Sequence, residues 1–543
     1  MGRIVRTGRT IPLMIRNPIL PGFNPDPSIC RAGDEFYIAT STFEWYPGVQ
    51  IHRSTDLVNW DLTCRPLNRA SQLDMRGNPD SGGIWAPCLS YADERFWLVY
   101  TDVKRLDGNF KDAHNYVVSA PSIGGPWSDP IYLSSHGFDP SLFHDDDGRK
   151  WYLVLQWNHV SSSVGGKPET SAFDGILLQE WSETRGLIGR PKKIFTGSSL
   201  GLTEGPHLHK RNGWYYLTVA EGGTGYQHAV TMARARSIDG PYELHPATHL
   251  ITAKDNADWP LQRAGHGQIV ETADGRTYHT HLCSRPLPGR YSPLGRETAI
   301  QKCVWRDDWL YLADGGLLPQ VDVPGLGETI AKPPQKLERT FDGTELPPEF
   351  QWLRTPFPER LFTLTGTVLR ITGRESIGSW YEQSLVARRQ EHLHYRAETT
   401  LSSFEPETYQ QAAGLATYYN RHKFHFLAVS RNWELGRCLM LMSCPGSWPD
   451  GRMEFPAEHI AIDGGPVDLA VEVNGTDQQF FWRQAGDWRS IGATLDARVI
   501  SDEGGRGEHA SFTGAFVGML AFDVTGSGRT ADFTHFSYEP EGT

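Results

Sequence analysis

Cysteine is scarce in this chain of 543 residues: there are seven, an odd number, and no CxxC pair occurs. A disulfide framework or a zinc site is therefore not expected, and a reducing, cytoplasmic compartment fits this usage. Long apolar runs are missing as well. No stretch approaches the ~20 apolar residues of a membrane helix, and the run at residues 11–15 is too short for the core of a signal peptide.

An excess of positive charge is also missing, since the formal net charge is −12 and the isoelectric point is about 5.9. Nucleic acid and anionic membrane surfaces bind to basic surfaces, so neither is expected as a partner. Aromatic residues, by contrast, are plentiful, with 18 Trp, 20 Tyr and 24 Phe. Most such rings pack in cores, but their flat faces also stack on sugar rings.

Five copies of one motif organise the first 320 residues. Their lead residues lie 59, 54, 65 and 62 positions apart, and an Asp or Asn follows each of them by eight positions. The lead residues are Asp26, Trp85, Asp139, Glu204 and His266. Units of this length, built from short strands, are typical of a propeller or a solenoid. If the units are related by rotation, the five lead residues converge on one axis.

Each copy predicts a β-hairpin with a tight turn. In the third copy, Asp147-Gly148 separates two runs of apolar and aromatic residues, and a type I′ turn there needs positive φ at both central residues. Gly213 and Gly275 stand at the same point of the fourth and fifth copies. A calcium loop is the alternative in the third copy, but it requires a Glu where the chain has Val154.

Segments between the hairpins are predicted to be the outer strands of successive units. Each has a turn signal beside a Trp or Tyr and then a short strand, at residues 56–67, 124–133 and 239–251. Helical periodicity is almost absent there. Four strands in each of five units predict a five-bladed β-propeller as the first domain, residues 1–320.

The motif stops at about residue 320. Residues 321–335 are rich in Pro and Gly and are expected to form a linker. Residues 336–543 alternate apolar and polar positions between turn signals such as Asn474-Gly475. This pattern predicts an antiparallel β-sandwich of the lectin-like, jelly-roll kind, so the fold class is all-β throughout.

Three of the five lead residues are carboxylic acids. Asp26 and Asp139 each precede a Pro, and Glu204 precedes Gly-Pro, so the backbone is stiff where each carboxyl is presented. One isolated Asp-Pro is more often a plain turn, but three acids at equivalent positions favour a chemical use. Glycoside hydrolysis needs one acid to protonate the leaving oxygen and one carboxylate to attack or to activate water. Asp26 and Glu204 are not neighbours in the ring, which leaves room for a water molecule and favours inversion.

A group of short motifs extends this interpretation: NPDPS, GGIWAPCL, FDPSLF, TEGPHL, RAGHGQ and LGRETAIQ. Each is weak alone, but together they make the chain resemble glycoside hydrolase family 43 enzymes of the two-domain β-xylosidase type, over nearly its whole length. The resemblance implies that Asp26 is the general base that activates water and that Glu204 is the general acid. It implies that Asp139 tunes the pKa of the acid and helps to orient it.

The resemblance also implies a pocket for one terminal sugar. Arg296 would contact substrate hydroxyls beside the carboxylates, while Phe43, Trp85 and Trp157 would form apolar walls. Phe512, from the sandwich, would reach over the pocket and close it. A closed pocket favours exo cleavage, whereas an open cleft would favour endo action.

His266 is left with two interpretations. In some relatives a His at this position is a water-mediated ligand of an axial calcium ion. In the xylosidase-like branch it hydrogen-bonds within the site, and no cofactor is required. One His alone is a poor argument for a metal, so calcium stays the less favoured interpretation.

The expected activity is therefore an inverting, exo-acting glycoside hydrolase that releases D-xylose from the non-reducing end of short β-1,4-xylo-oligosaccharides. Side activity as an α-L-arabinofuranosidase is expected, and that activity as the main one stays open because the two sugars place similar groups around the anomeric centre. A homo-oligomer such as a tetramer is expected from similar proteins.

Two rival interpretations agree less well with the sequence. A non-catalytic carbohydrate-binding propeller explains the aromatic residues but not three converging carboxylates. Invertase-like hydrolases share the architecture and retain configuration, but their WMNDPNG-like, RDP and EC motifs are absent from this sequence.

Overall fold

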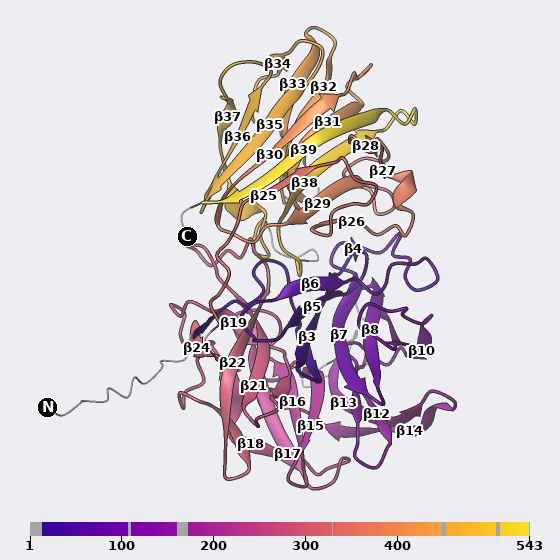
Figure 1. The fold of residues 1–543 in the computed structure, drawn as a ribbon, viewed down its shortest axis with the longest axis vertical. Helices are drawn as coiled ribbons and strands as arrows, with labels where there is room; N and C mark the ends of the chain where they lie inside the picture. The colour runs from indigo at the N-terminus through magenta and orange to yellow at the C-terminus, as the bar shows by residue number, and fades with distance from the viewer. Residues whose placement is uncertain are drawn as a thin grey trace, which may run out of the picture.

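The computed structural model describes residues 14–106, 110–159, 172–327, 329–446, 452–505 and 511–541. The N-terminal apolar run, 11–15, thus begins outside the described residues. Within them, every regular element is a β-strand except two short 3-10 helices, η1 (Pro358–Arg360) and η2 (Ala497–Val499). Figure 1 shows two β bodies stacked along the long axis, the N-terminal one below and the C-terminal one above. The prediction of an all-β fold is confirmed.

The lower body is a five-bladed β-propeller, and each blade is an antiparallel sheet of strands that lie close together in the sequence. Blades 1 and 2 contain β2 (Ser28–Ala32), β3 (Glu35–Thr40), β5 (Gln50–Ser54) and β6 (Asp61–Cys64), then β7 (Gly83–Ala92), β8 (Arg95–Arg105), β9 (Asp112–Ala120) and β10 (Ile131–Ser134). Blades 3 and 4 contain β11 (Ser141–His144), β12 (Lys150–Trp157), β13 (Phe173–Ser182) and β14 (Gly186–Phe195), then β15 (Glu204–Arg211), β16 (Trp214–Glu221), β17 (Ala229–Ala235) and β18 (Glu243–Thr252). Blade 5 contains β19 (Gln262–Gly265), β20 (Ile269–Glu271), β21 (Thr277–Ser284), β22 (Glu297–Arg306) and β23 (Trp309–Leu312).

Burial explains why the aromatic and aliphatic runs of the motif form the second strand of each blade. β3, β8 and β16 are buried over most of their length, because both faces of an inner strand pack against neighbouring blades. The outermost strand β6 alternates exposed and half-buried residues instead. The innermost strands therefore begin around the axis, where the lead residues lie.

The hairpin turns are only partly as predicted. Asn212 and Gly213 both have positive φ, 50° and 72°, as a type I′ turn requires. In the third copy only Gly148 does, and its N–H donates to the Asp145 carbonyl at 3.0 Å. The type I′ prediction is wrong there, because the loop runs over residues 145–149 and closes as a type I turn followed by a left-handed glycine. It is wrong in the fifth copy for the same reason, since Gly275 has a positive φ but Asp274 does not, and the Gly275 N–H donates to the Thr272 carbonyl at 3.0 Å.

The N-terminal segment closes the propeller. β1 (Met14–Arg16) pairs antiparallel with β24 (Asp322–Pro324). Nearby, the Ile19 N–H donates to the Thr298 carbonyl of blade 5 at 2.9 Å. The segment 321–335, predicted as a linker, thus begins with a strand that belongs to the propeller.

The upper body is a sandwich of two antiparallel sheets. The first sheet contains β25 (Leu337–Thr340), β27 (Phe362–Leu364), β28 (Leu369–Thr372), β30 (His394–Ser403), β35 (Val467–Asn474), β36 (Asp477–Arg483), β37 (Arg489–Asp496) and β39 (Thr530–Pro540). The second contains β26 (Phe350–Leu353), β29 (Ser384–Arg389), β31 (Gln411–Asn420), β32 (Lys423–Asn432), β33 (Gly436–Pro445), β34 (Ile460–Ala461) and β38 (Phe516–Asp523), with β4 (Trp45–Tyr46) at its edge.

The second sheet is covered on both faces. Along β29, Val386 packs into the core that the two sheets share, whereas its neighbours Leu385 and Ala387 join a cluster that contains Phe43 and Trp85 of the propeller. Alternate residues of a strand point to opposite faces, so this sheet lies between the first sheet and the mouth of the propeller. The sandwich therefore rests on the end of the propeller where the lead residues converge.

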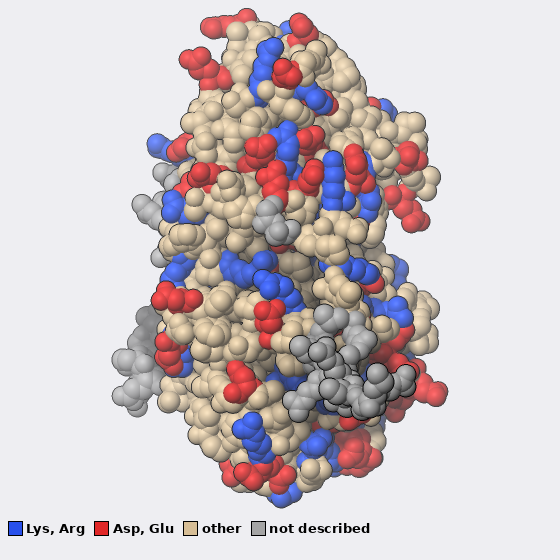
Figure 2. Space-filling view, turned by 60° about the vertical axis from the view of Figure 1, so that its left-hand side comes forward, with Lys and Arg blue, Asp and Glu red and all other residues tan. Residues whose placement is uncertain are grey.

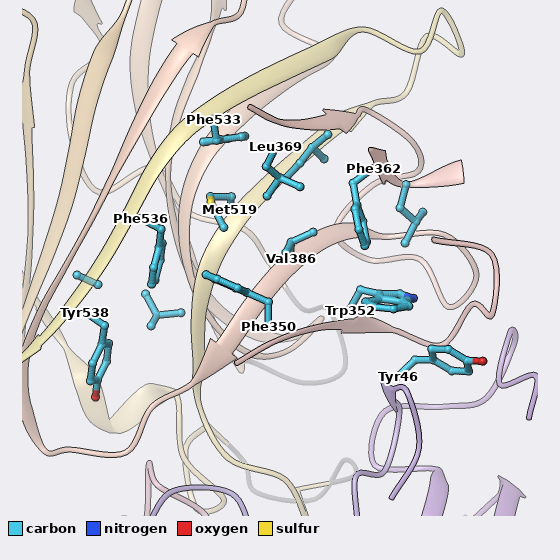
Figure 3. Close-up of a cluster of buried hydrophobic side chains, with 14 of the residues drawn as sticks. Tyr46, Phe350, Trp352, Phe362, Leu369, Val386, Met519, Phe533, Phe536 and Tyr538 are labelled. Atoms are coloured by element: carbon cyan, nitrogen blue, oxygen red, sulfur yellow. The ribbon is translucent and has the colours of Figure 1, made fainter. Parts of the chain in front are cut away.

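A strand from the propeller completes the second sheet. β4 pairs with β26 through Tyr46 opposite Trp352 and Trp45 opposite Leu353. Figure 3 shows Tyr46, which comes from the propeller, beside Trp352 of the sandwich. The centroids of the two rings lie 5.5 Å apart. Trp45 stacks on Phe516 of β38 at 3.6 Å. Phe512 lies just before β38. The packing of Trp45 on Phe516 therefore fixes the segment that carries Phe512 to the propeller.

Candidate active site

A pocket of about 380 Å³ lies at the mouth of the propeller, beside the segment that leads into β38. All nine side chains predicted as site residues line it: Asp26, Phe43, Trp85, Asp139, Trp157, Glu204, His266, Arg296 and Phe512. Its other lining residues are Leu106, Lys111, Phe138, Phe173, Gly223, Thr224, His228 and Leu282. The pocket is thus built by the propeller and completed by one residue of the sandwich.

Unusual backbone conformations aim three of the lead residues. Asp26, Asp139 and His266 have φ of 54°, 58° and 41°, in the left-handed region that non-glycine residues seldom adopt. Such conformations cost roughly 1–3 kcal/mol each and persist where surrounding structure enforces them, often at functional sites. At Asp26 and Asp139 the neighbouring prolines and the strands that begin two residues later supply that constraint.

Irregular strand pairing aims the other two lead residues. The pairing of β7 with β8 shifts register between Trp85 and Cys88. The pairing of β15 with β16 shifts between Glu204 and His207. Bulges of this kind bend a strand and redirect its side chains, and they are common beside active sites.

Asp26 is held by two hydrogen-bond donors. Its Oδ1 accepts from Arg296 Nη1 at 2.9 Å and its Oδ2 accepts from Ser41 Oγ at 2.6 Å. The Asp26 and Arg296 side chains are 6% and 3% exposed, so water screens this ion pair little. Two donors, one of them charged, thus hold both oxygen atoms of the carboxyl group in place. Arg296 Nη2 also donates to the Phe512 carbonyl at 2.9 Å, which ties the ion pair to the sandwich.

Glu204 and Asp139 lie in the opposite electrostatic setting. Burial, reinforced by the negative charge of Asp26, raises the pKa of Glu204 to about 8, although the cations Arg296 and Lys111 partly offset this. Burial also raises the pKa of Asp139 well above its usual range, and the charges of Glu204 and Asp26 add to the effect. Near neutral pH, therefore, this side of the pocket holds a proton that a bound molecule can receive.

Aromatic rings form the apolar walls. The Trp85 ring meets Phe138 edge-on at 5.1 Å and Phe512 edge-on at 6.1 Å. On the other side, the ring centroids of Trp157 and Phe173 lie 5.3 Å apart. The Lys111 ammonium lies 4.5 Å from the centroid of the Trp157 ring. Flat walls of this kind fit the faces of a sugar ring and exclude water from the carboxyl groups.

Ser81 connects two of these walls. Its carbonyl accepts from Trp85 Nε1 at 2.7 Å, and its Oγ accepts from the Phe512 N–H at 3.1 Å. Its own N–H donates to the Glu44 carboxylate at 2.9 Å. Ser81 is fully buried, so its contacts hold a propeller wall and the sandwich residue in one frame.

His266 fits a metal poorly. Its Nδ1 lies 3.8 Å from Asp26 Oδ1, and burial lowers its pKa, so the ring is neutral near pH 7. Gly205 packs so closely on this ring that a Cβ there would lie 2.8 Å from its atoms. The next ring, His207, offers nitrogen, whereas calcium binds oxygen ligands. Among the described residues, no group of three or more His, Cys, Asp or Glu side chains is placed to hold a metal ion.

Several lining residues were missed by the sequence analysis. Phe138 stands directly before Asp139 in the motif FDPSLF, so its position next to a lead residue is a signal that could have identified it. Thr224 and His228 lie in the glycine-rich loop between β16 and β17, and a glycine-rich loop at a propeller mouth is a usable signal. Lys111 has no sequence signal that marks it.

Two protein families match this chain, one over each body. Residues 15–310 match Glycosyl hydrolases family 43, and residues 338–539 match the Beta xylosidase C-terminal Concanavalin A-like domain. The chain belongs to glycoside hydrolase family 43. It is a glycoside hydrolase, and the predicted propeller and lectin-like sandwich are both confirmed.

Similar family 43 proteins align over almost their entire length. The chain is 55% identical to Xylosidase/arabinosidase 43B of Humicola insolens, over 97% of this chain and 98% of the relative. It is 47% identical to a Beta-xylosidase of Bacillus subtilis (strain 168), over 97% and 100%. The crystal structure of xylan beta-1,4-xylosidase from Bacillus halodurans C-125 superposes with a TM-score of 0.91 at 48% identity, over 97% of this chain and 100% of that one.

The surface charge, the lengths of the helices and the state of the cysteines relate to the partners and the compartment expected for this family 43 enzyme. On the face in Figure 2, acidic and basic side chains are interspersed rather than gathered by sign. The described part of the chain contains no helix that is both long and apolar enough to cross a membrane. All seven cysteines are free, and six of them are buried.

Proposed function

We propose that this enzyme releases D-xylose from the non-reducing end of short β-1,4-xylo-oligosaccharides with inversion at the anomeric carbon. The observation that carries the proposal is the contrast inside one pocket between Asp26, paired with Arg296, and Glu204, which has a pKa of about 8. One carboxyl group is prepared to accept a proton and the other to donate one, as glycoside hydrolysis requires.

In the proposed mechanism, Asp26 takes a proton from a water molecule as the water oxygen attacks the anomeric carbon. The bond from that carbon to the leaving oxygen breaks at the same time, and Glu204 gives its proton to the leaving oxygen. Asp139, which interacts electrostatically with Glu204, tunes the pKa of this acid and helps to orient it. Arg296 binds sugar hydroxyls while it holds Asp26, and His266 hydrogen-bonds within the site as a neutral ring. No step passes through a metal or a cofactor.

Exo cleavage is proposed because Phe512 approaches Trp85 across the pocket and is held at both backbone ends, by Ser81 and by Arg296. A pocket bounded in this way accepts the end of a chain rather than its middle. Phe43, Trp85 and Trp157 would contact the terminal sugar as apolar walls.

A second activity is proposed on α-L-arabinofuranosides. The relative from Humicola insolens is named a xylosidase/arabinosidase, and it is 55% identical to this chain. The two sugars present similar groups around the anomeric carbon. We propose the xylosidase as the main activity, because the relative from Bacillus subtilis and the structure from Bacillus halodurans are both named for xylosidase activity.

We also propose that the enzyme works inside the cell as a homo-oligomer such as a tetramer. The seven free cysteines support a reducing compartment. Light scattering coupled to size-exclusion chromatography tests the oligomer: the mass of one chain alone would refute it.

The deciding experiment compares initial rates on 4-nitrophenyl β-D-xylopyranoside and 4-nitrophenyl α-L-arabinofuranoside. The xyloside is expected to be the better substrate, and NMR of the first-formed xylose is expected to show the α-anomer. An initial β-anomer would refute inversion. No turnover of either substrate by folded protein would favour a carbohydrate-binding function instead.

A further inference from the structure

A buried ion pair joins the two domains close to the pocket. Arg263 Nη1 of β19 lies 2.6 Å from Asp502 Oδ2 of the sandwich, and the two side chains are only 5% and 4% exposed. Arg263 stands three positions before His266 and has a positive φ of 55°. Removing two charges from water is costly, so such a pair is weak evidence for a role in stability alone. Its other contacts indicate what else it does.

On the propeller side, the ion pair reaches the wall of the pocket. Arg263 Nε donates to the Thr224 carbonyl at 2.8 Å, and Thr224 lines the pocket. Thr224 lies in the glycine-rich loop between β16 and β17, and the Tyr226 hydroxyl of the same loop donates to the Arg290 carbonyl at 2.9 Å. The guanidinium therefore binds this wall and the sandwich with different nitrogen atoms.

On the sandwich side, the ion pair reaches the residue that covers the pocket. Asp502 Oδ1 accepts from the Tyr419 hydroxyl at 2.5 Å, and that hydroxyl accepts from the Thr513 N–H at 3.1 Å. Thr513 directly follows Phe512. Lys423 Nζ donates to the Ser501 carbonyl at 2.9 Å, which holds the backbone directly before Asp502.

A continuous chain of hydrogen bonds thus runs behind the pocket from one wall to the other. It passes from the Thr224 carbonyl through Arg263, Asp502 and Tyr419 to the backbone beside Phe512. We propose that Asp502 is a positioning residue that, through Arg263 and Tyr419, fixes the separation of Thr224 and Phe512 and so determines which sugar ring the pocket prefers. This inference rests on the proposed function.

The chemistry of the two sugars explains why wall separation matters. Xylopyranose is a six-membered ring, whereas arabinofuranose is a five-membered ring with an exocyclic hydroxymethyl group. Two walls at a fixed distance fit one of these shapes better than the other, and a small displacement of a wall changes the preference. A role in stability alone would leave the preference of the folded enzyme unchanged.

Two conservative substitutions cut the two ends of the chain separately. Tyr419→Phe removes the hydroxyl that joins Asp502 to the backbone beside Phe512. Arg263→Lys keeps the positive charge beside Asp502. A single ammonium cannot bind Asp502 and the Thr224 carbonyl at once, so the hydrogen bond to Thr224 is lost. Tyr538→Phe is the matched control, because the buried Tyr538 hydroxyl also accepts backbone N–H groups, at Glu391 and His392, and does not line the pocket.

Both test variants are expected to raise KM for the xyloside about five- to tenfold with little change in kcat, as the loss of one buried hydrogen bond implies. Both are also expected to change the ratio of kcat/KM for xyloside and arabinofuranoside at least about threefold. The double variant should fall short of the product of the single effects, because both act through Asp502. Tyr538→Phe should leave KM and the ratio at wild-type values, even where it lowers Tm.

Wild-type KM and ratio in folded Tyr419→Phe would overturn the inference, as would an equal change in Tyr538→Phe. Should Arg263→Lys not fold, Tyr419→Phe alone decides. Binding of D-xylose and of L-arabinose, followed by tryptophan fluorescence, gives a readout that needs no turnover. A wild-type protein that binds these sugars without hydrolysing either substrate would refute the proposed function, while the binding ratio of the variants still tests the role of Asp502.

Discussion

Asp26 and Glu204 face one pocket and are almost equally buried, with 5% and 7% of their surface exposed, yet their surroundings differ in kind. Asp26 meets the Arg296 guanidinium and the Ser41 hydroxyl at hydrogen-bond distance. Glu204 has its pKa raised to about 8 by burial and by the charge of Asp26, and the charges of Arg296 and Lys111 offset this only in part. Burial alone therefore does not assign the roles of two carboxyl groups.

The position of one arginine makes the difference. Arg296 hydrogen-bonds Asp26 directly, whereas at Glu204 burial outweighs the charges of Arg296 and Lys111 and favours the neutral form. Blade 5 supplies the arginine and blade 1 the carboxylate that it holds, while blades 3 and 4 supply the two acids that hold protons. The acid and base sides of the pocket are thus separated by blade.

Removal of Asp26 is expected to have the largest effect. Asp26→Ala should lower kcat/KM by at least about 10³-fold on every substrate, including aryl xylosides with good leaving groups, because no group is left to activate water. Steady-state rates on 4-nitrophenyl β-D-xylopyranoside and on xylobiose check this. A variant that retains its activity on the aryl substrate would assign the base elsewhere.

Removal of Glu204 should distinguish leaving groups. Glu204→Ala is expected to lower the rate on xylobiose by about 10²- to 10⁴-fold, because its leaving alcohol needs a proton. The rate on 4-nitrophenyl β-D-xylopyranoside should fall far less, since nitrophenolate leaves without one. Equal damage to both substrates would contradict the contrast between the two sides of the pocket.

The pH dependence sharpens the comparison. Glu204 must be protonated to act, so kcat/KM should fall as pH rises through about 8. Lys111 lowers the pKa of Glu204, so Lys111→Met should move this alkaline limb to higher pH, by less than about one unit. Rates measured from pH 5 to 10 check the shift. An alkaline limb that moves to lower pH would show that Glu204 is not the titrating acid.

The smallest expected effect concerns stability. Glu204 binds its proton more tightly in the folded protein than in the unfolded chain, so its contribution is present below about pH 4.5 and is lost as pH rises through about 8. Glu204→Gln removes the buried charge and should raise Tm by a few degrees at pH 9, and by less at pH 5. Calorimetry at both pH values checks this, with Glu183→Gln, an exposed substitution, as the control. A Tm gain that is the same at both pH values would contradict the raised pKa.

Much of this arrangement could be predicted from the sequence, and the reason is periodicity. The spacing of Asp26, Asp139 and Glu204 predicts that they converge, because equivalent positions in successive blades meet at the axis. Phe512 lies outside the periodic motif, and only the resemblance to family 43 named it. Contacts such as Arg263 with Asp502 join distant segments that share no pattern, so physical reasoning from the sequence alone had no means of pairing them.

The boundary between the domains shows the same limit. The Pro- and Gly-rich composition of residues 321–335 predicts a linker, yet β24 within it pairs with β1. Composition reports the local freedom of the backbone but not a partner strand at the other end of the chain. Likewise, no local signal in Trp45 and Tyr46 predicts that a two-residue strand of the propeller joins a sheet of the sandwich.

The pairing of β1 with β24 and of β4 with β26 has a consequence during synthesis on the ribosome. β1 leaves the ribosome some 300 residues before β24, and β4 leaves it some 300 residues before β26. Until these partners have been translated, the early strands carry backbone groups with no native partner, and such edges pair readily with other chains. We therefore expect nascent chains arrested near residue 310 to depend on chaperones more than the complete protein does, although such chains already contain every acidic residue of the pocket.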